Sequence, residues 1–82
     1  MEPTEIVFDE PVKLGSAEYP SITLREPKAG ELEKAEKYGG GLGFIITLAH
    51  LVAGVPRRVI EELPRHELNK ITDFFNGSPG AL

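Results

Sequence analysis

The chain has 82 residues, two histidines and no cysteine, which fits one small domain and excludes disulfide bonds and a plausible zinc site. A chain of this length buries roughly 60% of its unfolded surface, so we expect it to gain stability as a homo-oligomer. The net charge of −4 argues against binding to nucleic acid, and the longest apolar run, residues 42–53, is too short to span a membrane. The N-terminus has no signal-peptide pattern, which predicts a reducing cytoplasm.

A β-hairpin is predicted over residues 5–25, because apolar residues alternate there with the period of a strand that buries one face. The run Gly15-Ser16-Ala17-Glu18 supplies the turn between the two strands. Pro11 and Pro20 have no N–H to give to a ladder, which places them at an edge or a bend. The alternating residues are Ile6, Phe8, Val12, Leu14, Ile22 and Leu24.

Two helices with different surfaces are predicted after the hairpin. The first, residues 30–38, has few apolar residues and should be mostly solvated. The run Gly39-Gly40-Gly41 ends it, because each glycine costs about 1 kcal/mol inside a helix. The second, residues 42–53, is apolar over an arc of about 220°, whereas a helix that lies on one core needs roughly 100° or more. Such a helix is either central to the fold or shared with a partner.

The remaining sequence predicts further short helices. Gly54-Val55-Pro56 breaks the chain, residues 56–63 form one helical segment, and residues 65–75 form an amphipathic last helix. Residues 76–82 are expected to form a flexible tail. The fold class is therefore α+β, an N-terminal β-hairpin followed by three to four short α-helices in a single domain of residues 1–82.

No pattern predicts an enzyme, a metal centre or a cofactor site. The glycines at 39–43 lack the Lys and Ser or Thr of a phosphate loop and indicate a flexible joint. His50 has no base partner or pocket and fits a structural or interface position, while His66 fits a solvated one. The basic pair Arg57-Arg58 is followed by the acidic pair Glu61-Glu62, which weakens a nucleic-acid interpretation further.

The run Ile6-Val7-Phe8-Asp9-Glu10-Pro11-Val12, then Gly15, then residues 22–32 resembles the opening of the small tail assembly chaperones of contractile-tailed bacteriophages. The likeness is strongest in the I-T-L-R-x-P-x-A-G stretch. It continues through Leu51-Val52-Ala53-Gly54-Val55-Pro56 to Phe74-Phe75 and covers about residues 5–75. Glu67 stands where the family often carries aspartate, so the charge is kept.

The resemblance implies a protein that binds the tape measure protein and keeps this long, apolar-striped helical chain soluble until tail tube subunits polymerise around it. It implies action in the host bacterial cytoplasm and absence from the mature virion. In related systems a ribosomal frameshift yields a longer form that recruits tail tube protein, and this chain matches the short form. The alternatives are a small structural tail or baseplate protein, and a small regulatory, antitoxin-like binding domain.

Two sets of residues follow from this interpretation. A chaperone for a helical client needs an apolar face, so one set is predicted to contact the client or another copy, with ordinary core packing as the alternative. It comprises Ile45, Leu48, Leu51, Val52, Phe74 and Phe75. The other set is structural: Arg25, Pro27 and Gly30 match the family motif at strand exit, break and helix start, and Gly54 and Pro56 lie at a chain break. Gly30 is expected to adopt a conformation that Ala29 could not.

Overall fold

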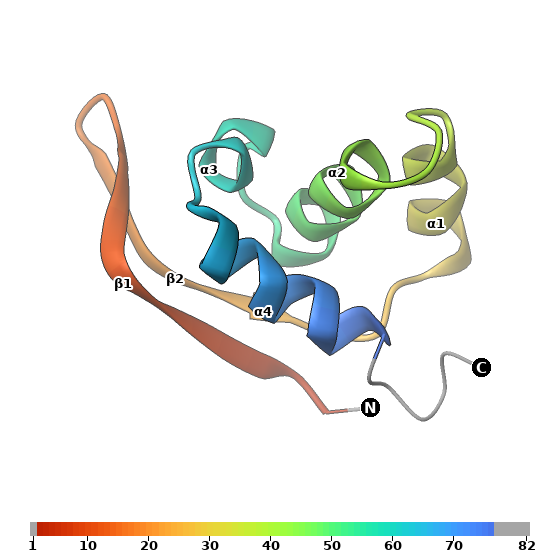
Figure 1. The fold of residues 1–82 in the computed structure, drawn as a ribbon, viewed down its shortest axis with the longest axis horizontal. Helices are drawn as coiled ribbons and strands as arrows, with labels where there is room; N and C mark the ends of the chain where they lie inside the picture. The colour runs from red at the N-terminus through yellow and green to blue at the C-terminus, as the bar shows by residue number, and fades with distance from the viewer. Residues whose placement is uncertain (1, 77–82) are drawn as a thin grey trace.

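The computed structural model describes residues 2–76 and shows an antiparallel hairpin followed by four helices (Figure 1). The elements are β1 (Thr4–Leu14), β2 (Ala17–Leu24), α1 (Ala29–Glu36), α2 (Leu42–Ala53), α3 (Arg57–Glu61) and α4 (Arg65–Asn76). The predicted α+β class is confirmed. Of the predicted tail, Asn76 is the last residue of α4, and residues 77–82 lie outside the described part of the chain.

The hairpin is bent by a large irregularity in β1. The register runs regularly from Thr4 to Val7 and again from Val12 to Leu14, but residues 8–11 of β1 face only Pro20 of β2. Extra residues of this kind bend a strand and increase its twist, and the hairpin curves around the helices accordingly (Figure 1). The turn consists of residues 15–16 alone, and is tighter than the four-residue turn predicted, because β2 already begins at Ala17.

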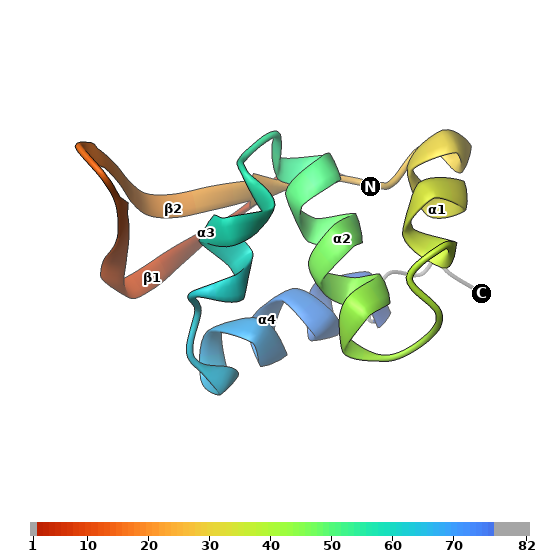
Figure 2. The ribbon, with the colours of Figure 1, turned by 90° about the horizontal axis from the view of Figure 1, so that it is seen from above.

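One hydrophobic cluster lies between the concave side of the hairpin and the helices. Helix α2 packs against α1, α3 and β2 and also touches α4, so it is the central helix of the fold (Figure 2). The wide apolar arc of this helix had left two possibilities, a central place in the fold or a place shared with a partner, and the structure shows the central place. The buried members of the cluster are Phe8, Val12, Ile22, Leu24, Ala35, Leu48, Ala49, Val52, Val59, Ile60, Ile71 and Phe75.

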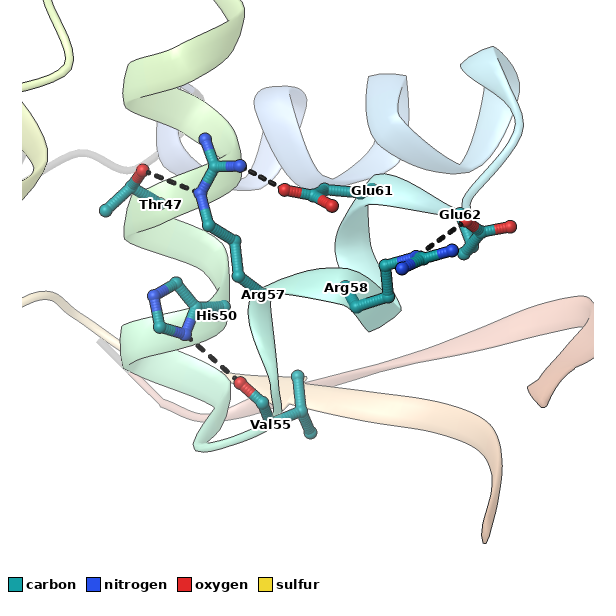
Figure 3. A network of polar contacts seen from close by, with 7 residues as sticks. All are labelled: Thr47, His50, Val55, Arg57, Arg58, Glu61 and Glu62. Carbon is teal, nitrogen blue, oxygen red and sulfur yellow. Dashed lines mark hydrogen bonds and ion pairs between the residues drawn. The ribbon is translucent and has the colours of Figure 1, made fainter. Parts of the chain in front are cut away.

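The corner between α2 and α3 depends on a glycine and a histidine. Gly54 has φ of +71° and ψ of 29°, a left-handed conformation that costs little only for glycine, and its N–H donates to the His50 carbonyl at 2.9 Å. The His50 ring nitrogen Nδ1 lies 3.1 Å from the Val55 carbonyl oxygen (Figure 3). Pro56 then precedes α3 as its N-cap residue. This geometry is consistent with the structural positions expected for Gly54, Pro56 and His50.

The expectation for Gly30 is wrong. Gly30 lies in the first turn of α1 without a positive φ, and a Cβ added there would meet no atom within 4 Å. Packing instead requires Gly43, where a Cβ would lie 3.0 Å from the Tyr38 carbonyl oxygen. The motif pattern did not reveal this, because the approach depends on how the chain folds back through the glycine joint between α1 and α2.

The two glycines should therefore respond in opposite ways to alanine. We expect Gly30→Ala to raise the free energy of unfolding by about 0.5–1 kcal/mol, because alanine is the better helix former and has room. Gly43→Ala should lower it by about 1 kcal/mol, because the Tyr38 backbone must move away from the new methyl group. Urea denaturation measures both, and changes of the same sign would contradict this account.

Candidate protein-interaction surface

The six residues predicted to contact a client or another copy fall into two groups in the structure. Leu48, Val52 and Phe75 are only 2%, 6% and 8% exposed and belong to the core cluster, which favours the core role that the sequence left open for them. The other three are half-buried: Ile45 and Phe74 pack against the same cluster, and Leu51 lies outside it. Part of each of these side chains is accessible to a partner.

Helix α2 has more apolar surface than the core covers. Its residues Leu42, Ile46 and Ala53 lie within about 40° of one another on the helix, beside the buried Ala49. Leu42 is 66% exposed, whereas Ile46 and Ala53 are half-buried and pack against the core cluster with part of their surface accessible. We call these three residues the α2 stripe. Among the described residues, four large apolar side chains are exposed: Val7 in β1, and Leu32, Tyr38 and Leu42 on or beside α1 and α2.

Arg57 connects the helical elements beside this surface (Figure 3). Its Nε donates to the buried Thr47 hydroxyl at 3.3 Å, and its guanidinium also pairs with Glu61. The same guanidinium lies 5.1 Å from the centre of the Tyr38 ring, within the range of a cation–π contact. Arg58 donates to Glu62 at 3.0 Å. Both arginines of the basic pair are thus neutralised by carboxylates one turn later, which leaves no concentrated positive patch there for nucleic acid.

The strand exit is fixed by an ion pair within the family-like motif. The Arg25 guanidinium donates to both carboxylate oxygens of Glu31, at 2.9 and 2.7 Å, and the Lys28 N–H donates to the same carboxylate at 2.8 Å. The hydrogen bonds from Arg25, with that of Lys28, lower the pKa of Glu31 from 4.5 to about 2. This ion pair is consistent with the structural role expected for Arg25, with Pro27 between the strand and the helix. Glu31 was not identified from the sequence as the partner of Arg25.

This pair should make stability depend on pH in acid. Because the pKa of Glu31 is lower in the folded chain, its contribution is fully present above pH 4.5 and is lost as the pH falls toward about 2. We expect Glu31→Gln to cost about 1 kcal/mol at pH 7, a modest value because Arg25 is partly exposed. Denaturation of both proteins from pH 7 to pH 2 should show the difference shrinking, and a constant difference would contradict the assignment.

A second polar cluster fastens α4 to the irregular part of β1. The Asp9 N–H donates to Glu67 Oε2 at 2.6 Å, and the Lys70 ammonium lies 3.0 Å from Oε1, although off the direction of an ideal hydrogen bond. His66 is exposed, as predicted, but its Nε2 lies 2.8 Å from Asp9 Oδ2. Asp9, His66 and Glu67 bring metal-type ligand atoms within 4.8 Å of one another. Each of the three already has a hydrogen-bonding or ion-pair partner within the chain, so the cluster serves to attach α4 to β1. We call Asp9, His66, Glu67 and Lys70 together the clasp.

No helix in the described residues is long and apolar enough to cross a membrane. No curated protein and no solved structure matches the chain at a significant level. A family model does match residues 5–79, and its description is "phage tail assembly chaperone proteins, E, or 41 or 14". The match spans the hairpin and every helix described above. The chain therefore belongs to this family of phage tail assembly chaperones.

Proposed function

We propose that the chain is a non-enzymatic chaperone that binds the tape measure protein, keeps it soluble and promotes assembly of the tail tube around it. Family membership supports a role in tail assembly. It acts in the host bacterial cytoplasm and is left out of the mature virion. A longer frameshifted form of the chain and the tail tube protein are further partners in this proposal.

The observation that carries the proposal is the surplus apolar surface of α2. A client with an apolar helical stripe binds by laying that stripe against an apolar groove or helix face. The α2 stripe, with the exposed Leu42 at its end, supplies such a face, and the half-buried Ile45 and Phe74 add accessible apolar surface. Leu51 is half-buried on the opposite side of α2 from the stripe. The net charge of −4 then helps to keep the complex dispersed in solution.

The same surface supports self-association. A cluster this small gives marginal stability to a single chain, and accessible apolar side chains are the usual contacts between identical subunits. We therefore propose a homo-oligomer in which copies cover part of this surface before the client binds. Sedimentation at micromolar concentration tests it, and a stable monomer would contradict it.

Binding is tested by co-purification of the tape measure protein with tagged chain variants. Leu42→Asp should abolish co-purification, because it places a charge at the end of the α2 stripe. Val7→Asp is the matched control, because Val7 is similarly exposed, at 60% against 66%, but lies in the hairpin. Equal retention of the client by both variants would contradict the proposed surface.

Mass spectrometry of purified virions separates a chaperone from a structural tail or baseplate protein. We expect the chain to be missing from finished particles that contain the tape measure protein. Its presence in stoichiometric amounts would favour the structural alternative.

A further inference from the structure

Helix α1 is held to the rest of the fold mainly through one neighbour, α2. It has eight residues, and Ala35 is its one buried side chain. Helices shorter than about 12–15 residues are marginal on their own, so α1 depends on its contact with the rest of the chain. Gly30 in its first turn weakens it further, without any packing reason for a glycine. Leu32 is 40% exposed, so the apolar side chains of α1 bury little surface.

The neighbour on which α1 packs is α2, at the end of the molecule away from the hairpin turn (Figure 2). No side chain of α2 is acidic or permanently charged; Thr47 and His50 are its only polar side chains. Whichever side of α2 is uncovered by a displacement of α1 is therefore apolar or weakly polar. The hairpin, α3 and α4 would keep their mutual contacts, because the other core residues come from those elements and α2.

The two ends of α1 are attached differently. Its first turn is anchored by the Arg25–Glu31 pair. Beyond its last turn the attachment consists of Tyr38, which contacts Gly43 and lies beside the Arg57 guanidinium, followed by three consecutive glycines. Tyr38 is 57% exposed, so this second attachment buries little area. The glycine joint allows α1 to leave α2 while its first turn stays attached to the strand exit.

We propose that α1 is a displaceable cover, and that an amphipathic helix of the client takes its place on α2. The structure itself shows the chemistry of the occupant, since the present occupant is a short amphipathic helix that presents a small side chain, Ala35, to this surface. A longer helix with large apolar residues would bury more surface there and displace α1. The identity of the occupant as the client rests on the proposed function.

Hydrogen exchange of the free protein is the first test. Amides of residues 32–38 should exchange at least about tenfold faster than those of residues 46–53, which corresponds to an opening of α1 that is easier by about 1.4 kcal/mol. Gly30→Ala should slow exchange in α1 by about two- to fivefold and leave α2 unchanged. Equal protection of the two helices in the wild-type chain would overturn the proposal.

A reversible cross-link provides the second test. A Cβ at Gly43 would lie 3.4 Å from the Tyr38 Cβ, close to the roughly 3.5–4.5 Å of disulfides, and the chain has no other cysteine. In the Tyr38→Cys, Gly43→Cys variant, oxidation should weaken binding of purified tape measure protein at least about tenfold, about 1.4 kcal/mol. Reduction of the same sample should restore binding, which controls for any strain from the substitutions.

The outcomes with tape measure protein distinguish the two proposals. Binding that removes the protection of α1 and is blocked by the cross-link supports both. Binding with α1 protection unchanged, or equal binding by oxidised and reduced forms, overturns the displacement of α1 and leaves the chaperone function standing. Absence of any binding by the wild-type chain overturns the proposed function, and the proposed occupant of α2 with it.

Discussion

Glu67→Ala is expected to lower the free energy of unfolding by about 2–4 kcal/mol, a large part of the roughly 5–15 kcal/mol that stabilises small proteins. The carboxylate is 1% exposed and accepts the Asp9 N–H in the part of β1 that has lost its regular ladder. Its removal leaves that N–H without its partner, deprives Lys70 of its counter-charge and opens a cavity between α4 and β1. Urea denaturation at pH 7 measures the loss.

Two variants identify the cause of this loss. His66→Ala should cost less than about 1 kcal/mol, because the His66–Asp9 pair is exposed. Glu67→Gln should fall between wild type and Glu67→Ala, because its amide oxygen still accepts the Asp9 N–H but no longer attracts Lys70. A Glu67→Ala protein within about 0.5 kcal/mol of wild type would show that the clasp does not hold α4 to the hairpin.

The adjacent residues Phe74 and Phe75 should differ sharply when each is replaced by alanine. Phe75 is 8% exposed in the core cluster, so Phe75→Ala should cost about 3–5 kcal/mol and unfold much of the protein. Phe74 is half-buried and meets Phe75 edge-on with ring centres 5.3 Å apart. Phe74→Ala loses mainly this pair, worth about 0.5–1.5 kcal/mol, and should leave a folded chain.

The second effect of Phe74→Ala concerns association. If Phe74 contributes to the proposed interaction surface, the folded variant should show weaker self-association or client binding in sedimentation and co-purification. Measurements at several protein concentrations separate stability from association. Equal destabilisation by both substitutions would contradict the different positions of the two rings, and wild-type association of Phe74→Ala would remove Phe74 from the proposed surface.

Local chemistry made much of the fold predictable. The bounds of α2 agree with the predicted residues 42–53, because glycines stand at both of its ends. The alternation of apolar residues likewise predicted the buried side of the hairpin, where Phe8 and Val12 are buried. Pro11 was expected at a bend or an edge and lies in the irregular segment of β1.

Tertiary contacts set the limits of these predictions. Glu67 accepts a hydrogen bond from the N–H of Asp9, which lies 58 positions away in the sequence, so no local pattern links the two residues. The arc of α2 showed surplus apolar surface, but which of its residues are buried depends on where α1, α3, α4 and β2 lie against it. Glu31 was within reach of sequence reasoning, because a carboxylate in the first turn of a helix that closely follows Arg25 is a plausible partner for it.

The most direct measurement of the central claim is the soluble fraction of the tape measure protein when it is expressed with and without this chain. We expect the client to be largely insoluble alone and to move into the soluble fraction with the wild-type chain and with Val7→Asp, but not with Leu42→Asp. A tape measure protein that stays equally insoluble with and without the wild-type chain would contradict the proposed function.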